Sequence, residues 1–403
     1  MVENSIEYPN KVKYIMNYVI AYPPHTFEGK ALKILFIFGT RPEAIKMCPL
    51  VLEFTKSPCF EVKVCITAQH REMLDQVLDI YNIKPDYDLN LMRSNQTLEW
   101  LTGAIVEGTG NVIKDFKPGL VLVHGDTTTS FASALAAFYH KTDVAHVEAG
   151  LRTGDIRSPW PEEANRKLTA TLSKLHFAPT ESAKKNLLKE GITEENIHVT
   201  GNTVIDALFN AINITKARSH KVSPAVTSLK KNIGNNNLIL VTGHRRENFG
   251  PNFENICLAL NALAVANPNT HIVYPVHLNP MVQKPVRHHL GSLNNVHLID
   301  PLDYLSFVSL MMRADIILTD SGGIQEEAPS LKKPVLVLRD KTERPEAVNA
   351  GTVQIVGTEK EAIVDAVTQL LIKPGSFKSK TNPYGDGLAC QRIAKIIKDE
   401  YDL

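Results

Sequence analysis

Short apolar runs alternate with helical patterns along most of the chain. The runs are rich in Val, Ile, Leu and Phe, and the segments between them have the spacing of helices. Buried strands separated by helices are typical of βαβ units, in which helices cover both faces of a parallel sheet. In the first half, the expected strands are residues 33–38, 62–68, 120–123, 144–147 and 175–178, and the expected helices are residues 42–54, 72–81, 98–115 and 128–139.

The alternation weakens over residues 200–235, where the stretch 232–237 is polar and rich in turn residues. It then resumes with expected strands at residues 238–242, 271–276, 296–299, 316–319 and 335–338. We therefore predict an α/β fold with two doubly wound, Rossmann-like domains that meet at a cleft. The domains are expected at residues 32–200 and 201–387, with residues 1–31 as an extension outside the fold and a last helix at about 388–401 that could belong to either domain.

Composition narrows the class of protein. A chain of 403 residues is too long for one core and is typical of two domains. The net charge of +1 provides no global field for nucleic acid, and no apolar run approaches the roughly 18 residues of a membrane span. The five cysteines are scattered without a C-x-x-C pair, which is typical of a reducing compartment. We expect a cytoplasmic protein without a nucleic-acid or membrane partner.

A glycine turn gives the first indication of a ligand. Ser321, Gly322 and Gly323 follow the apolar run 314–318 and open a helix, so that backbone N–H groups converge where a phosphate could bind. Glu327 stands one turn further along that helix. Because a carboxylate suits a sugar hydroxyl better than a phosphate, the segment predicts a nucleotide or nucleotide-sugar site.

Basic residues also follow expected strands, where ligands bind in open α/β sheets. Arg41 and Lys46 stand about one turn apart after the first strand and predict a grip on a phosphate, although they could also be a surface pair at a helix start. Arg344 precedes a proline as Arg41 does, and is a candidate for an anion or a sugar oxygen. The chain has no P-loop motif and no G-x-G-x-x-G at a strand–helix junction, which disfavours dinucleotide binding.

Carboxylates end two neighbouring strands. Asp126 could simply cap the following helix, but Glu148 is not a usual cap or turn residue. Two nearby carboxylates raise each other's proton affinity, which favours acid–base chemistry. Glu162 and Arg166 are spaced i, i+4, and their simplest interpretation is a helix salt bridge of about 0.3–0.5 kcal/mol.

Two histidines lie at strand ends of the second domain. His244, in a Gly-His-Arg-Arg cluster, could neutralise a phosphate as imidazolium or donate a proton to a leaving group. His277 has no metal-ligand companion at helical spacing, and the chain has no H-E-x-x-H motif. We therefore expect no metal site.

Together these motifs resemble the bacterial non-hydrolysing UDP-N-acetylglucosamine 2-epimerases, from about Leu32 to the C-terminus. The matching strings, in order, are GTRPEAIK, AQHREMLDQV, VHGDTTT, HVEAGLRTGD, SPWPEEANR, GNTVIDAL, TGHRREN, YPVHLNP, TDSGGIQEEAPSL and ERPEAV. The resemblance implies a GT-B arrangement with the active site in the interdomain cleft. It also implies that the last helix, about 388–403, crosses back to the first domain.

The resemblance further implies interconversion of UDP-N-acetylglucosamine (UDP-GlcNAc) and UDP-N-acetylmannosamine (UDP-ManNAc) without cofactor or metal. UDP is eliminated across C1–C2 to give 2-acetamidoglucal and is then added back, with a proton delivered to the opposite face of C2. A homodimer and a supply of ManNAc for surface polysaccharides are also implied.

The resemblance carries site residues over to matching positions. The catalytic candidates are Asp126, Glu148, Glu162 and His244. The substrate-binding candidates are Arg41, Lys46, Arg166, Phe307, Ser321, Gly322, Gly323, Glu327 and Arg344. Many family members are activated by a second UDP-GlcNAc, and the matching positions are Gln69, Glu163, Arg245 and His277. Which carboxylate removes the C2 proton is left open.

Three alternatives share the same expected ligand. A GT-B glycosyltransferase would pass the sugar to an acceptor, although it needs fewer carboxylates. A nucleotide-sugar sensor would bind without turnover, although the acid–base positions are intact. A hydrolysing epimerase would release free N-acetylmannosamine and UDP.

Overall fold

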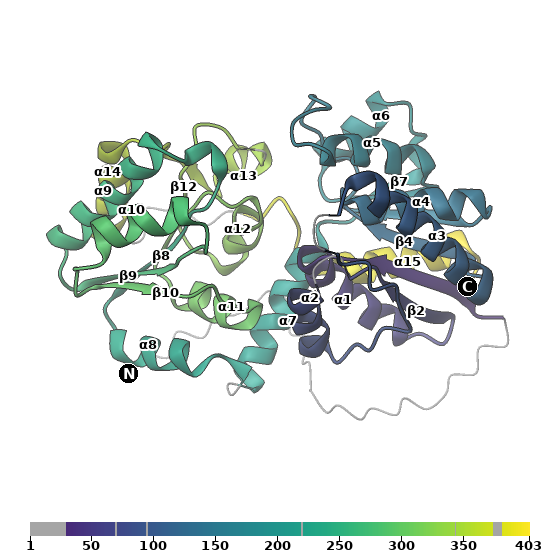
Figure 1. Ribbon diagram of the computed structural model, residues 1–403, viewed down its shortest axis with the longest axis horizontal. Helices are drawn as coiled ribbons and strands as arrows, with labels where there is room; N and C mark the ends of the chain where they lie inside the picture. Colours follow the sequence, from purple (N-terminus) through teal and green to yellow (C-terminus); the bar gives the residue numbers. More distant parts are fainter. Residues whose placement is uncertain (1–29, 69–70, 94–95, 219–220, 343, 374–380) are drawn as a thin grey trace.

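The computed structural model describes residues 30–68, 71–93, 96–218, 221–342, 344–373 and 381–403. They form two α/β domains that lie side by side (Figure 1). The predicted fold class, two Rossmann-like domains in a GT-B arrangement, is confirmed.

In the described ranges, the first domain has a seven-stranded parallel sheet of order β3-β2-β1-β4-β5-β6-β7. Its strands are β1 (Leu32–Phe38), β2 (Phe60–Ile66), β3 (Tyr87–Asp88), β4 (Leu120–His124), β5 (Asp143–Val147), β6 (Leu175–Ala178) and β7 (Ile197–Val199). The strand order reverses between β1 and β4. In open α/β sheets this switch point opens a crevice for ligands at the carboxyl ends of the strands.

The residues of β1 alternate between the two faces of this sheet. Ile34 and Phe36 join the core cluster beneath α1 (Arg41–Thr55) and α2 (Arg71–Tyr81). Leu35 and Ile37 join the opposite cluster with α3 (Leu98–Phe116) and α4 (Thr128–Tyr139). Each buried side chain of this size contributes roughly 1.5–3 kcal/mol. This burial on both faces explains why β1 reads as a continuous apolar run.

The second domain repeats the plan with a six-stranded parallel sheet, counted over the described residues, of order β10-β9-β8-β11-β12-β13. Its strands are β8 (Asn237–Thr242), β9 (Thr270–Pro275), β10 (Val296–Ile299), β11 (Ile316–Thr319), β12 (Val335–Val337) and β13 (Gln354–Ile355). Its helices include α9 (Pro251–Ala266), α10 (Pro280–Leu290), α11 (Tyr304–Arg313), α12 (Gly322–Glu327), α13 (Pro345–Asn349) and α14 (Lys360–Ile372). The order reverses between β8 and β11, which places a second crevice there.

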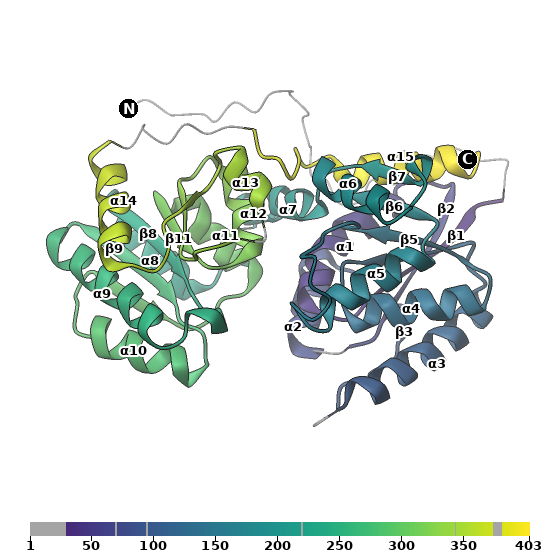
Figure 2. The same ribbon diagram turned by 90° about the horizontal axis from the view of Figure 1, so that it is seen from above.

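Two helices join the domains. The helix α7 (Thr203–Ala217) packs against α1 on one side and against α11 and α12 on the other, and lies between the domains in both views (Figures 1 and 2). The helix α15 (Ala389–Glu400) runs along the first domain, where Ile393 and Ile397 join the core. Asp206 of α7 accepts hydrogen bonds from the first two N–H groups of α15, at 3.2 and 2.9 Å. The exact domain boundaries stay predictions.

The chain crosses between the domains at two glycines that touch. Gly201 has φ +85° and Gly385 has φ +124°, which are conformations that favour glycine. A Cβ on Gly201 would lie 3.3 Å from the Cα of Gly385. The two crossing segments are therefore in backbone contact just before α7 begins.

Most of the predicted elements are present, but the differences have physical reasons. The strand expected at residues 62–68 is Phe60–Ile66, and Ala68 has left-handed backbone with φ +52°. The loosened region 200–235 contains α7 and α8 (Pro224–Ile233), whose role is to connect rather than to repeat the βαβ pattern. Among the described residues, no helix is long and apolar enough to cross a membrane. All five cysteines are free thiols.

Candidate active site

Side chains from both domains meet in one buried network, in which a neutral amide joins two ion pairs. The Lys46 ammonium, on α1, is paired with the Glu148 carboxylate, which follows β5. The side-chain amide of Asn202 donates to Glu148 Oε2 at 2.7 Å and to Glu326 Oε2 at 3.0 Å. Glu326, on α12, is paired in turn with Arg344. This network of side chains joins the carboxyl end of the first sheet to the glycine turn of the second domain.

Glu148 has an unusual backbone conformation and an unusual pKa. Its φ of +62° is left-handed, which costs a non-glycine residue of order 1–3 kcal/mol and persists where the surroundings enforce it. Burial raises the pKa of Glu148, but the Lys46 ammonium and the His124 ring, at 3.6 Å, outweigh burial, so the pKa lies well below its usual value. The predicted rise in proton affinity between neighbouring carboxylates is therefore wrong for Glu148.

Lys46 is committed to carboxylates. Burial lowers its pKa, but the charges of Glu148 and Glu326 more than compensate, so the pKa is raised. Lys46 was expected to grip a phosphate, and that role stays a prediction. Its ammonium is paired with Glu148.

Asp126 is paired with a cation 40 positions later in the sequence. Arg166 Nη2 lies 2.6 Å from Asp126 Oδ2, and Nη1 donates to Glu163 Oε2 at 3.0 Å. Burial lowers the pKa of Arg166, but Asp126 and Glu163 raise it further than burial lowers it. The expected salt bridge between Glu162 and Arg166 is wrong, because Arg166 reaches these two carboxylates instead. Within the described structure, Glu162 Oε2 is buried without a hydrogen-bond partner.

The loop after Glu148 is fixed by close backbone contacts. Glu163 accepts from the N–H groups of Thr153 and Gly154 at 3.2 and 3.3 Å. Gly150 has φ +88°, and a Cβ there would lie 2.3 Å from the carbonyl oxygen of Ala183. The loop can therefore pass α6 (Glu181–Lys189) only where a side chain is absent.

Gly150→Ala should lower the free energy of unfolding by roughly 2–4 kcal/mol, because it adds a backbone clash to left-handed strain. Gly154→Ala is a matched control: its φ is +85°, but nothing lies within 4 Å of the added Cβ. That variant should lose only about 1–2 kcal/mol. Urea denaturation compares the two, and equal losses would show that the contact with Ala183 does not matter.

In the second domain, Asp320 fixes the loop that carries His244. Asp320 Oδ2 accepts from the N–H groups of His244 and Arg245, both at 2.8 Å, and from Asn248 Nδ2 at 3.3 Å. The His244 ring stacks on His277, with ring centroids 5.3 Å apart. Burial lowers the pKa of His244 although Asp320 opposes this, which favours a neutral imidazole rather than the imidazolium considered from sequence.

The glycine turn is surrounded by guanidinium groups. A Cβ on Gly322 would lie 3.6 Å from Arg245 Nη2 and 3.7 Å from Arg344 Nη2. Ser321 caps α12 and is partly exposed, and Gly323 is exposed. On the first domain, Arg41 begins α1, burial lowers its pKa, and it has no carboxylate partner in the described part of the chain. These groups suit an anion bound between the domains.

Glu327 and Phe307, which are expected to contact the uridine, are largely packed within the second domain. Glu327 is 5% exposed and accepts a hydrogen bond from the Tyr304 hydroxyl at 2.9 Å. Burial raises the pKa of Glu327 to about 7, with the Tyr304 hydrogen bond opposing. Phe307 lies on α11 and packs partly exposed against the core. Their contacts with uridine stay predictions.

The four residues expected for an activator site differ in location and burial. Arg245 and His277 lie beside Gly322 and His244, respectively. Glu163 is fully buried and holds the loop at residues 153–154. Gln69 lies outside the described residues. Activation by a second ligand stays a prediction.

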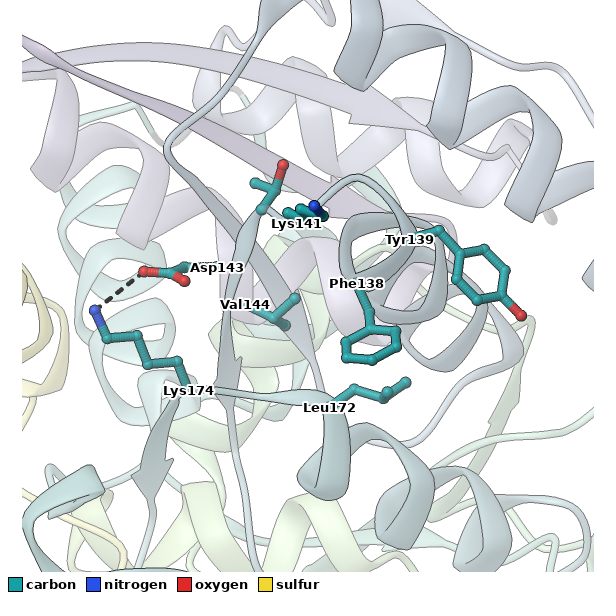
Figure 3. A pocket seen from close by; sticks show the side chains of 8 residues that line it. Phe138, Tyr139, Lys141, Asp143, Val144, Leu172 and Lys174 are labelled. Carbon is teal, nitrogen blue, oxygen red and sulfur yellow. Dashed lines mark hydrogen bonds and ion pairs between the residues drawn. The ribbon is translucent and has the colours of Figure 1, made fainter.

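A hollow of about 250 Å³ opens between the domains, and Arg166 and Arg344 both line it. Beside it, the hydroxyls of Thr180 and Ser182 donate across the interface to Glu346. A larger hollow of about 500 Å³ lies at the opposite, amino ends of β5 and β6 (Figure 3). Among the described residues, no group of three side chains could hold a metal ion.

Sequence reasoning missed three residues that hold this site together. Asn202 reads as an ordinary helix cap, and Glu326 as the neighbour of Glu327. Asp320 belongs to the segment that the sequence analysis singled out, but it fixes the His244 loop through hydrogen bonds to residues 75 and 76 positions away in the sequence. Only the charge-rich setting of these residues in motifs at strand ends could have indicated them.

The fold and site define a two-domain α/β protein with paired carboxylates and cations gathered between its domains. A sequence model of the family described as UDP-N-acetylglucosamine 2-epimerase matches residues 52–398. The chain belongs to the UDP-N-acetylglucosamine 2-epimerase family, and its enzyme class is that of an isomerase.

Individual relatives agree over nearly their full length. The chain is 57% identical to the UDP-N-acetylglucosamine 2-epimerase of Yersinia pestis, over 91% of this chain and 99% of the relative. It is 56% identical to the enzyme of the same name from Escherichia coli, with the same coverage. The crystal structure of UDP-GlcNAc 2-epimerase from Neisseria meningitidis bound to UDP-GlcNAc is 54% identical, with a TM-score of 0.84 over 91% of this chain and 100% of that one.

Proposed function

We propose that this enzyme interconverts UDP-GlcNAc and UDP-ManNAc without hydrolysis, by eliminating UDP to 2-acetamidoglucal and adding it back. The observation that carries the proposal is the meeting of Glu148 and Asp126, each paired with its own cation, with the guanidinium-lined Gly322 turn across the domain interface. The Neisseria relative was crystallised with UDP-GlcNAc, which supports the choice of substrate. The two sugars are stereoisomers, so the reaction needs no net redox change.

The first requirement of this chemistry is help for the leaving diphosphate. The C2–H bond is only weakly acidic, so charge that develops on the leaving oxygen must be stabilised. Arg344 and Arg245 face Gly322 from the second domain, and Arg41 stands on the first. Guanidinium groups form forked hydrogen bonds with phosphate oxygens, and the enclosed setting strengthens them.

The second requirement is acid–base groups on both faces of the sugar ring, because C2 is inverted. The lowered pKa of Glu148 keeps it ionised at neutral pH, so that it can accept a proton. Asp126 and the unpartnered Glu162 carboxylate supply further groups nearby on the first domain. The assignment of one carboxylate to the C2 proton stays open within this set.

Product analysis tests the proposal. The purified chain, incubated with UDP-GlcNAc alone, should give an equilibrium mixture of the two UDP sugars by NMR. Accumulation of free N-acetylmannosamine and UDP would instead indicate a hydrolysing enzyme. A substrate that stays inert until an acceptor is added would indicate a glycosyltransferase.

UDP binding at pH 7 should release protons if Glu327 accepts hydrogen bonds from the ribose. The pKa of Glu327 is raised to about 7 in the free enzyme, and hydroxyl donors favour its ionised form. Calorimetry in buffers of different ionisation enthalpy should show up to roughly half a proton released near pH 7, and almost none at pH 9. Glu327→Gln should remove the buffer dependence. Unchanged buffer dependence in that variant would rule out Glu327 as the source.

We infer that the enzyme works in the cytoplasm as a homodimer and supplies ManNAc for surface polysaccharide. Phe138 and Tyr139 at the end of α4 are 58% and 65% exposed and line the hollow in Figure 3, where Phe138 lies beside Leu172. An exposed apolar patch of this kind suits a second copy. Phe138→Glu should halve the mass measured by light scattering. Val265→Glu, on the equally exposed Val265 of α9, should leave the mass unchanged.

A further inference from the structure

Asn202 occupies an exceptional place between the domains. It follows Gly201 at the point where the chain crosses, and its side chain is 2% exposed. The side-chain amide donates to Glu148, 54 positions away in the first domain, and to Glu326, 124 positions away in the second. One amide thus uses both of its hydrogens on carboxylates that belong to different domains.

The simplest role for Asn202 is to cap α7. Its Oδ1 accepts from the N–H of Val204 at 3.0 Å, as an N-cap does. That role uses the oxygen only, and serine or aspartate would fill it equally well. The bonds to Glu148 and Glu326 need two donated hydrogens besides the cap oxygen, whereas a serine hydroxyl has one hydrogen and an aspartate carboxylate has none. The three contacts together also fix the orientation of the amide, because its oxygen must face Val204.

The bridge through Asn202 depends on how the two domains are positioned relative to each other. Glu326 is fully buried and is paired with Arg344, so it moves with the second domain. Glu148 sits on the first domain. The two carboxylates can share one amide only when the domains are in the arrangement seen in the structure.

We propose that Asn202 is a positioning residue that orients the Glu148 carboxylate for proton transfer only when the second domain is docked through Glu326. This inference rests on the proposed epimerase function. The bridge couples the docking of the second domain, which carries Arg344 and Arg245, to the placement of an acid–base group on the first domain. Proton transfer is thereby restricted to the arrangement in which the two domains are docked.

Asn202→Ser keeps the cap oxygen but cannot bridge the two carboxylates, because its single hydroxyl hydrogen can serve only one of them. Hydrogen bonds to charged groups are strong enough that kcat should fall roughly 10- to 100-fold. KM and the affinity for UDP should change by less than about 3-fold, because the Asn202 side chain bonds to Glu148, Glu326 and Val204 rather than to the cations proposed to hold UDP. Asn279→Ser is the matched control: Asn279 caps α10 in the same way, with Oδ1 2.9 Å from the N–H of Met281. It should leave kcat unchanged.

The pH profile separates positioning from a purely structural effect. The charged or titratable groups that face Glu148 are Lys46 from α1, His124 from β4, and Glu326 and Arg344 from the second domain. All of them remain in Asn202→Ser. Loss of one donor to the ionised carboxylate should therefore move the acid limb of the kcat profile to higher pH.

Glu326→Ala removes the acceptor on the second domain, so it breaks the same bridge and should reproduce the fall in kcat. A double-mutant cycle on thermal unfolding of the UDP-free protein, with Asn202→Ser and Glu326→Ala, should show non-additive effects. Additive unfolding effects, or a wild-type kcat and pH profile in Asn202→Ser, would overturn the inference. Absence of epimerisation by the wild-type chain would instead overturn the proposed function, and the unfolding cycle would still test the bridge.

Discussion

Glu148→Gln should abolish most turnover while leaving UDP bound with nearly normal affinity. Glutamine keeps the shape and the hydrogen bond from Asn202 but cannot accept a proton, and loss of a positioned acid–base group typically costs about 10²–10⁴ in rate. Initial rates by NMR measure kcat, and calorimetry measures the affinity for UDP. Near-normal turnover would remove Glu148 from the acid–base set.

The same substitution leaves Lys46 buried without its partner, so the free energy of unfolding should fall by roughly 3 kcal/mol. Glu53→Gln provides the matched control, since Glu53, on α1, pairs with Lys56, the residue that follows the helix. That exposed pair should contribute at most about 1 kcal/mol, and kcat should not change.

Arg344→Ala should weaken UDP binding by roughly 10- to 100-fold, because it removes one side of the cation cluster at Gly322. It also leaves the fully buried Glu326 without its cation, which should cost about 3–5 kcal/mol of stability. The double variant Arg344→Ala/Glu326→Gln separates the two effects. It should recover most of the unfolding free energy but none of the affinity for UDP.

Arg392→Ala is a suitable control for this series. Arg392 pairs with Asp386 at an exposed site, where such pairs contribute about 0–1 kcal/mol, and also donates to the carbonyl oxygen of Thr200 at 3.1 Å. Stability should fall by no more than about 1–2 kcal/mol, and UDP affinity should not change. If Arg344→Ala binds UDP as tightly as the wild type, the diphosphate is not held at the Gly322 turn.

The fold could be predicted because local pattern and global structure agree. In β1, Ile34 and Leu35 are both apolar because helices cover both faces of the sheet, so the strand is evident from sequence alone. The short strands β3, β7 and β13 were not predicted, because two or three residues form no apolar run. The helix α7 was not predicted either, because its apolar positions face both domains rather than one.

The location of the site could be predicted from the sequence, but the pairing of its charged residues could not. Placement at strand ends correctly indicated that Glu148 and the Gly322 turn approach each other. The pairing of cations with carboxylates depends on contacts between residues that are far apart in the sequence. The predicted salt bridge between Glu162 and Arg166 was therefore wrong, because Arg166 pairs with Asp126. For the same reason the bridge through Asn202 was not foreseen.

The central claim is that C2 of the sugar is deprotonated and reprotonated while UDP leaves and returns. The most direct test is incubation of the chain with UDP-GlcNAc alone in D₂O, followed by proton NMR of the UDP sugars. We expect the C2 proton signal to disappear from both UDP-GlcNAc and UDP-ManNAc, with no free sugar formed. Epimerisation with full retention of the original C2 proton, or no change in the UDP-GlcNAc, would contradict it.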